Sequence, residues 1–215
     1  MQDGLNRHFL LRKLHSLTGL VPAGVFLLFH MWENSLSRRD NMVEYGAGYY
    51  NDHVVKFIND INYIRLLEVA LLGSILFHAV YGAVIWWQSR SNVTQYKYVN
   101  NWGFFLQRLT ALVTLAFILY HVASTRFAGE AVTGDLFGHM ASSLRNPAIM
   151  VVYMVGVLLA SFHLAYGIWL MAITWGVATH PRAQKLMLAV GAGLFAVLVF
   201  MGFHGLWGFN QAFFA

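Results

Sequence analysis

The fold is decided by residues 147–175, which read PAIMVVYMVGVLLASFHLAYGIWLMAITW. No charged residue occurs between Arg145 and Arg182. A helix needs about 20 mainly apolar residues to cross the hydrocarbon layer of a bilayer, because each residue adds only about 1.5 Å. This segment is long enough, and its lack of charge is typical of a membrane-spanning helix. The chain is therefore predicted to be an integral membrane protein.

Four further segments share this apolar character. Together with the first, they predict helices over about residues 12–34, 62–88, 104–125, 147–176 and 184–209. Hydrophobic residues make up 58% of the chain and charged residues 11%, against roughly 25% charged residues in an ordinary globular protein. We therefore expect an all-α integral membrane protein, a five-transmembrane-helix bundle that forms one domain over residues 1–215.

Basic residues divide unequally between the two predicted sides of the membrane. One side comprises the N-terminal tail, the 88–103 loop with the start of the third helix, and the 176–185 loop. Its only acid is Asp3, and its basic residues are Arg7, Arg12, Lys13, Arg90, Lys97, Arg108, Arg182 and Lys185. The positive-inside rule then predicts a cytoplasmic N-terminus and a C-terminus outside. The formal charge of +5 reflects this topology, so no nucleic-acid partner is expected.

The two loops on the opposite side each contain a short amphipathic stretch. The apolar positions that share a helical face are Val54, Val55, Ile58 and Ile61 in one loop, and Val132, Leu136, Met140 and Leu144 in the other. Such stretches lie along a membrane surface or cap the bundle. The sequence favours neither arrangement over the other.

Four histidines fall within the hydrocarbon part of the predicted spans: His30, His78, His121 and His163, one on each of the first four helices, whereas His204 lies near the outer end of the fifth. An ionisable residue in a span is costly and indicates function by default. The chain has no cysteine, which excludes thiolate ligation and covalent CxxCH attachment of a cofactor. Because imidazole is a common axial ligand of haem iron, four regularly placed histidines predict two haems. A single buried histidine would as readily be a packing residue.

Depth in the membrane predicts which histidines pair. His30 lies about 18 residues after Arg12, or about 27 Å along the helix axis, and His121 lies at a similar depth on the parallel third helix. His78 and His163 are on the two helices that run the other way, and both lie nearer the cytoplasmic side. The expected pairs are His30 with His121 and His78 with His163.

Local sequence supports a large planar cofactor beside these histidines. The pattern His-x-x-Tyr-Gly occurs at residues 78–82 and again at 163–167. Gly82 and Gly167 each follow their histidine by one helical turn, where a large side chain would collide with a porphyrin. Close packing of small residues between membrane helices is the alternative explanation.

Haem propionates are anionic and should lie near cations and water. The candidates at the cytoplasmic side are Arg12, His15, Ser16 and Arg108. Positive-inside anchoring explains the two arginines equally well.

These features together resemble the dihaem cytochrome b anchor subunits of succinate:quinone oxidoreductase, respiratory complex II, and in particular the Bacillus-type succinate:menaquinone reductases. The segments that carry the resemblance are RKLHSLTGLVPAGVFLLFH at 12–30, FHAVYG at 77–82, QYKYVNNWGFFLQRLTA at 95–111, YHVASTRF at 120–127 and PAIMVVYMVGVLLASFHLAYGIWLMAITWGVATHPRAQ at 147–184. The resemblance extends over almost the whole chain.

The resemblance implies a role in a larger complex in the bacterial cytoplasmic membrane. Flavoprotein and iron–sulfur subunits would be the partners, and electrons would pass through two haem b groups to a quinone, menaquinone in this type. It also implies that His78 and His163 hold the haem proximal to the iron–sulfur subunit and that His30 and His121 hold the distal one. Trp32 and Glu33, beside the distal pair, are the candidate quinone residues. Nothing in this chain would itself oxidise succinate, so no catalytic residue is assigned.

Several alternatives stay open at this point. The same role in a quinol:fumarate reductase fits the motifs, although Ser161 stands where some such relatives carry a glutamate for proton transfer. The anchor cytochrome b of a hydrogenase or formate dehydrogenase is another. A proton-coupled transporter predicts broken helices and midplane charges, which the fourth and fifth spans lack. A haem-free anchor that only docks soluble subunits is the last.

Overall fold

A computed structural model describes residues 2–38, 48–129 and 134–210, with side chains from residue 7 onward. Every regular element in these ranges is helical. The elements are α1 (Gln2–Thr18), η1 (Gly19–Gly24), α2 (Val25–Ser35), α4 (Gly48–Tyr50), η2 (Asn51–Val55), α5 (Lys56–Asn59), α6 (Ile64–Gln88), α7 (Val99–Ser124), α9 (Leu136–Leu144), α10 (Pro147–Thr174) and α11 (Pro181–Phe209). The all-α prediction is therefore confirmed.

Five helical segments of the described chain are long and apolar enough to cross a membrane. They are Arg7–Ser35, Ile64–Gln88, Val99–Ser124, Pro147–Thr174 and Pro181–Phe209. The five-helix prediction is confirmed, although three of the helices begin before their expected starts. α1 begins at Gln2 and not at 12, α7 at Val99 and not at 104, and α11 at Pro181 and not at 184. α7 continues past its apolar part because its first turns, residues 99–103, lie at the end of the bundle, where exposed polar and aromatic side chains are tolerated.

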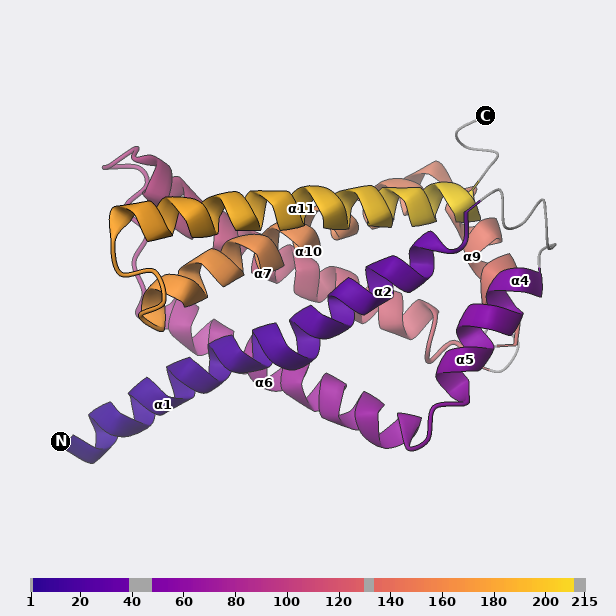
Figure 1. Cartoon of the computed structure of the whole chain (residues 1–215), viewed down its shortest axis with the longest axis horizontal. Coiled ribbons are helices and arrows are strands. Elements are labelled where there is room, and N and C mark those ends of the chain that lie inside the picture. The colour runs from indigo at the N-terminus through magenta and orange to yellow at the C-terminus, as the bar shows by residue number, and fades with distance from the viewer. Residues whose placement is uncertain (1, 39–47, 130–133, 211–215) are drawn as a thin grey trace.

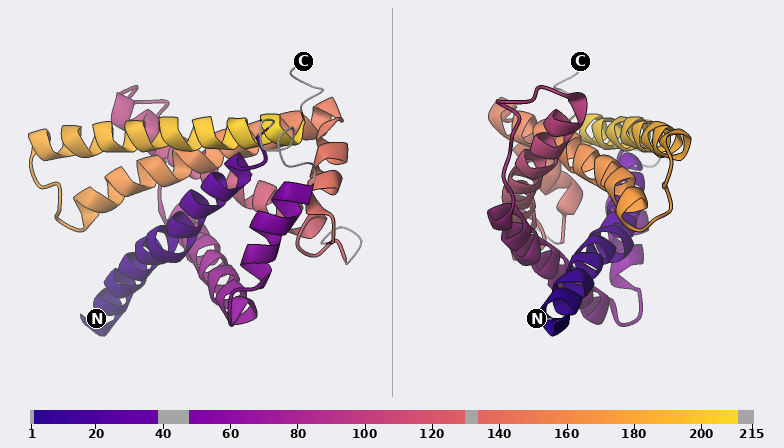
Figure 2. Two further views of the ribbon diagram at one scale, coloured as in Figure 1. Left: turned by 45° about the vertical axis from the view of Figure 1, so that its right-hand side comes forward. Right: turned by 90° about the vertical axis from the view of Figure 1, so that its left-hand side faces the viewer.

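The helices form an elongated bundle whose two ends differ (Figure 1). α1 begins at one end, where the connections 89–98 and 175–180 also lie, and we call this the N-end. α4, α5 and α9 lie at the opposite end, where α11 finishes, and we call this the α9-end. α10 packs against both α7 and α11, and α2 packs against α11. α1, η1 and α2 form one continuous rod, which packs against α6 through α1 and η1 (Figure 2).

Local sequence explains where the last two helices begin. Pro147 and Pro181 occupy the first turn of α10 and α11, where the missing N–H costs nothing. The preceding residues act as N-caps: the Asn146 side chain accepts from Ala148 N at 2.9 Å, and Nδ1 of His180 accepts from Ala183 N at 3.3 Å. His180 is thus the N-cap of α11.

Pro22 interrupts the regular hydrogen bonding of the first span. Proline lacks an N–H and its ring clashes with the carbonyl four residues earlier. The chain responds with a π-helical segment, Gly19–Gly24, between α1 and α2. This wider turn alters the rotation of α2 relative to α1, and it lies between the parts of the rod that carry His15 and His30.

The short helices at the α9-end cap the bundle. Val54, Met140 and Leu144 are buried and belong to the same core as Met31, Leu198 and Phe209. Asn51 and Asp135 join the two loops, since Asn51 Nδ2 donates to Asp135 Oδ1 at 2.8 Å. Of the two arrangements that the sequence left open, the described residues adopt the cap, and Val132 lies outside the described residues.

Candidate functional site

One large cavity runs along the inside of the bundle. Its volume is about 1540 Å³, which exceeds the roughly 300–1,000 Å³ of a typical small-molecule pocket. The spans α1, α2, α6, α7 and α10 all contribute to its wall, and most of that wall is apolar. His30, His78, His121 and His163 all line this cavity.

The structure brings His78 and His163 together in the N-end half of the cavity. Their ring centroids lie 6.1 Å apart, and the ring planes are nearly perpendicular at 85°. Nδ1 of His78 donates to the main-chain oxygen of His15 at 2.8 Å, and Nδ1 of His163 donates to that of Gln107 at 3.1 Å. A carbonyl can only accept, so each Nδ1 carries the proton and each Nε2 keeps its lone pair.

Residues of α1 and α7 surround this N-end pair closely. The His15 ring stacks on the His78 ring with centroids 4.0 Å apart, and a Cβ on Gly19 would collide with the His78 ring. On the other side, Gln107 Nε2 donates to the main-chain oxygen of His163 at 3.0 Å. The two imidazoles are therefore fixed mainly by contacts with the neighbouring helices.

His30 and His121 form the second pair, toward the α9-end. Their ring centroids lie 5.7 Å apart, at an interplanar angle of 69°. Nδ1 of His30 donates to Glu33 Oε1 at 2.9 Å, and Nδ1 of His121 lies 3.3 Å from the Tyr153 hydroxyl. That hydroxyl donates onward to the sulfur of Met140 at 3.8 Å, which leaves it to accept from His121.

A short polar network anchors the α2 side of this α9-end pair. Asn34 Nδ2 donates to the main-chain oxygen of His30 at 2.7 Å, and the buried Tyr50 hydroxyl donates to Asn34 Oδ1 at 3.0 Å. Burial and then the charge of Glu33 raise the pKa of Tyr50 above its ordinary value. The phenol therefore stays a hydrogen-bond donor at neutral pH.

The four candidate propionate residues all line the N-end of the cavity. Arg12 reaches Gln88 Oε1 at 3.5 Å, and Arg108 donates to Ser89 Oγ at 2.5 Å while it covers the Phe104 ring. Ser16 accepts from the Trp175 indole at 2.9 Å. His15 stacks on His78 and its buried Nδ1 has no partner among the described residues.

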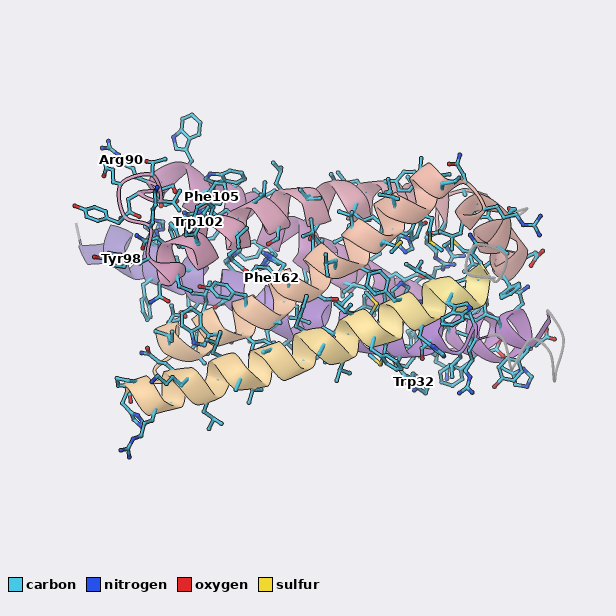
Figure 3. The ribbon with its side chains drawn as sticks, turned by 90° about the horizontal axis from the view of Figure 1, so that it is seen from above. Trp32, Arg90, Tyr98, Trp102, Phe105 and Phe162 are labelled. Atoms are coloured by element: carbon cyan, nitrogen blue, oxygen red, sulfur yellow. The ribbon has the colours of Figure 1, made fainter. Side chains whose placement is uncertain are left out.

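The two candidate quinone residues do not lie together. Glu33 lines the cavity beside His30, whereas the half-exposed Trp32 lies at the outer edge of the bundle (Figure 3). Arg90, Tyr98 and Trp102 gather at the N-end in the same view, as expected of an interfacial aromatic and basic belt. Another carboxylate, Glu68, lines the cavity near the α9-end and pairs with Arg126 at 2.6 Å.

The two glycines of the repeated His-x-x-Tyr-Gly pattern lie on the cavity wall, beside side chains of other helices. Gly82 and Gly167 both line the cavity, where an added Cβ would approach the His15 ring to 3.1 Å and Gln107 Nε2 to 3.3 Å. A larger residue at either position would therefore crowd the His15 ring or the Gln107 side chain.

Sequence reasoning missed the hydrogen-bond partners of the four imidazoles. One of them carried a signal: Glu33 follows His30 by three residues, a spacing that places both side chains on one helical face. The carbonyl partners of His78 and His163, and the Tyr153 hydroxyl, come from other helices. No pattern in the sequence marks such contacts.

Apolar spans around one cavity, with a histidine on each of four helices and the rings paired at two heights, define a multi-pass membrane protein with paired imidazoles inside its bundle. No family model matches the chain. The chain is 36% identical over 205 residues to the succinate dehydrogenase cytochrome b558 subunit of Bacillus subtilis (strain 168), which covers 95% of this chain and 98% of that protein. It belongs to this family of succinate dehydrogenase cytochrome b subunits, and it is a multi-pass bacterial membrane protein.

Proposed function

We propose that this chain anchors a succinate dehydrogenase in the bacterial cytoplasmic membrane and conducts its electrons to a quinone, menaquinone in the relatives that its sequence resembles. His78 and His163 would hold one haem b, and His30 and His121 would hold a second. A haem held by these residues would supply one-electron transfer.

The donor set fits a haem better than a bare metal ion. The described part of the chain holds no group of three or more His, Asp or Glu side chains suited to a metal ion. Two imidazoles suffice for haem, because the porphyrin supplies the other ligands. The ring centroids of the two pairs lie 5.7 and 6.1 Å apart, so the two imidazoles of each pair could hold one group between them.

The protonation of the rings supports the same assignment. Metal-binding histidines usually donate their second N–H to a carbonyl or carboxylate, which fixes the tautomer and the ring orientation. His78, His163 and His30 do this through Nδ1, and His121 approaches the Tyr153 hydroxyl in the same way. The one competing contact at Nε2 is a long one, 3.4 Å from the Asn34 amide to His30. This arrangement of Nδ1 bonds is the observation that carries the proposal.

The two ends of the bundle suit different partners. The basic residues of the N-end predict that it faces the cytoplasm, where the flavoprotein and iron–sulfur subunits would dock. Electrons would then enter at the N-end pair and leave near the α9-end pair. The quinone would approach the α9-end of the cavity, where Glu33 is part of the wall, whereas the half-exposed Trp32 lies at the outer edge of the bundle.

A reduced-minus-oxidised spectrum with a haem-to-protein ratio on the detergent-purified complex tests this function. The parent is expected to hold two haems per chain, and His78→Ala and His121→Ala should each remove one spectral component. His204→Ala is the matched control, since His204 lies in a span but outside the cavity lining and stacks on Phe200. One haem or none in the parent would favour an anchor that only docks soluble subunits.

A further inference from the structure

Glu33 is a buried carboxylate in direct contact with one of the paired imidazoles. Its side chain is 7% exposed, and among the described residues no other aspartate or glutamate is buried. Oε1 accepts from His30 Nδ1 at 2.9 Å, and the buried Oε2 has no partner within the described chain. Burying a carboxylate is costly unless a positive charge lies close to it.

The described residues supply little positive charge to Glu33. Glu68, the other carboxylate on the cavity wall, pairs with Arg126 at 2.6 Å, whereas the one ion pair of Glu33 is with the His30 imidazole. An imidazole that binds a metal through Nε2 remains uncharged, so the positive charge that balances Glu33 would have to come from the metal itself.

We propose that Glu33 is a positioning residue that holds the His30 imidazole and, through its negative charge, favours the oxidised form of the cofactor that His30 binds. This inference rests on the proposed function. Oxidation adds one positive charge at the iron, and the carboxylate stabilises that charge through the bonded ring. The ring also gains anionic character from the Nδ1–H···carboxylate bond, which strengthens it as a ligand of the oxidised metal.

The other three imidazoles lack this charge. Nδ1 of His78 and Nδ1 of His163 face main-chain carbonyls, and Nδ1 of His121 faces a hydroxyl. All three partners are neutral. Glu33 therefore makes the α9-end pair electrostatically different from the N-end pair, and its removal should change only one of the two redox components.

A redox titration of the purified, quinone-depleted complex tests this, with Glu33→Gln and Glu33→Leu beside the parent. Gln can still accept from His30 Nδ1, so it removes the charge alone, whereas Leu removes both the charge and the bond. The component to follow is the one that His121→Ala abolishes. We expect Glu33→Gln to raise the midpoint potential of this component by about 59 mV for one electron, which corresponds to about a tenfold change in its oxidised-to-reduced ratio. The other component should not move.

The low-spin EPR signal gives a second readout, because its position depends on how the imidazole is held. Glu33→Leu should shift the signal of the affected component more than Glu33→Gln does. Glu68→Gln, which removes a carboxylate of the same cavity that is bonded to no histidine, should leave that signal unchanged. Equal midpoint shifts of both components, or a shift in Glu33→Leu alone, would overturn the inference. A parent without two haems would instead overturn the proposed function.

Discussion

The two histidine pairs are held in different ways. The Nδ1 atoms of the N-end pair bond to main-chain oxygens of His15 on α1 and Gln107 on α7. The Nδ1 atoms of the α9-end pair bond to the side chains of Glu33 and Tyr153. A main-chain oxygen survives any substitution, so only a shift of the helix removes it. The N-end pair should therefore be sensitive to steric changes in its neighbours, and the α9-end pair to the loss of single polar atoms.

The ring contacts show the same contrast. At the N-end, His15 stacks on His78 and Gly19 lies against the same ring. At the α9-end, Phe26 stacks on His30 with centroids 5.1 Å apart, and Phe117 stacks on His121 at 5.7 Å. Both phenylalanines come from the same helix as their histidine, four residues earlier. The N-end pair thus depends on how helices approach one another, whereas much of the α9-end support is local.

The largest effect is expected from Gly19→Leu. Even a Cβ at this position collides with the His78 ring, and overpacking of a well-packed site costs about 1–3 kcal/mol. The bulkier side chain should displace His78 and remove the spectral component that depends on it, which haem content and the reduced-minus-oxidised spectrum would show. The other component should persist at full intensity.

Gly73→Leu is the control for that substitution. Gly73 lies on α6, the helix that carries His78, and a Cβ there meets nothing within 4 Å. It should leave both spectral components intact. If Gly19→Leu does the same, the N-end pair is not held by the approach of α1.

Tyr153→Phe should have a smaller effect, confined to the α9-end pair. It deletes the hydroxyl 3.3 Å from His121 Nδ1 and keeps the ring. A hydrogen bond of this kind contributes about 0.5–1.5 kcal/mol, so we expect a shifted EPR signal and haem binding weakened by up to about tenfold. Tyr166→Phe on the same helix, whose hydroxyl lies against Gly103, should change neither property. If Tyr153→Phe removed the whole spectral component, the hydroxyl would be needed for haem binding at the α9-end pair and not only for the orientation of the His121 ring.

Tyr50→Phe should alter stability while both spectral components remain. The substitution leaves Asn34 Oδ1 without its donor at a site where Tyr50 is only 2% exposed, at a cost of about 1 kcal/mol. Thermal unfolding of the detergent-solubilised complex measures this cost at neutral pH.

The pH dependence of that difference follows from the raised pKa of Tyr50. Burial, and after it the charge of Glu33, raises the pKa of Tyr50 in the folded protein. In the unfolded chain the same tyrosine ionises near its ordinary pKa of about 10. The stability that the protonated phenol contributes is complete below pH 10 and is lost as the pH rises above it. The parent and Tyr50→Phe should therefore converge in stability at alkaline pH, and a constant gap would contradict this assignment.

The fold was predictable because a helix in a bilayer is described by length and rise alone. Runs such as 147–175 are apolar over a membrane thickness, and α10 and α11 begin at the prolines that follow their cap residues. The same arithmetic placed His30 level with His121 and His78 level with His163, and the structure brings these rings to within 5.7 and 6.1 Å. That these rings bind haem stays a prediction.

The partners of the imidazoles were not predictable, because they depend on how each helix is rotated about its axis. The π-helical segment at Gly19–Gly24 changes that rotation between His15 and His30, and no hydropathy pattern marks it apart from Pro22. Trp32 and Glu33 show the consequence. They are adjacent in the sequence, yet Glu33 lines the cavity and Trp32 lies at the edge of the bundle.

The smallest effect on the α9-end pair is expected from substitution of Asp135, because Asp135 acts on that pair only indirectly, through α9. Asp135 Oδ1 caps α9 by accepting from Gly138 N at 2.9 Å and also accepts from Asn51. The Gly138 bond, and then the Asn51 bond, lowers the pKa of Asp135. The stability it contributes is therefore present above its ordinary pKa of about 3.9 and is lost as the pH falls through the lowered value.

Asp135→Ala should destabilise α9 by about 0.5–2 kcal/mol, while Asp135→Asn should cost less because asparagine also caps helices well. Hydrogen exchange of the amides of residues 136–144 measures this local opening against that of α10. Met140 on α9 accepts from the Tyr153 hydroxyl, so loosening α9 weakens only a contact behind His121. If Asp135→Ala shifted the EPR signal as far as Tyr153→Phe does, the α9-end pair would depend on the cap as a whole, and its support would be no more local than that of the N-end pair.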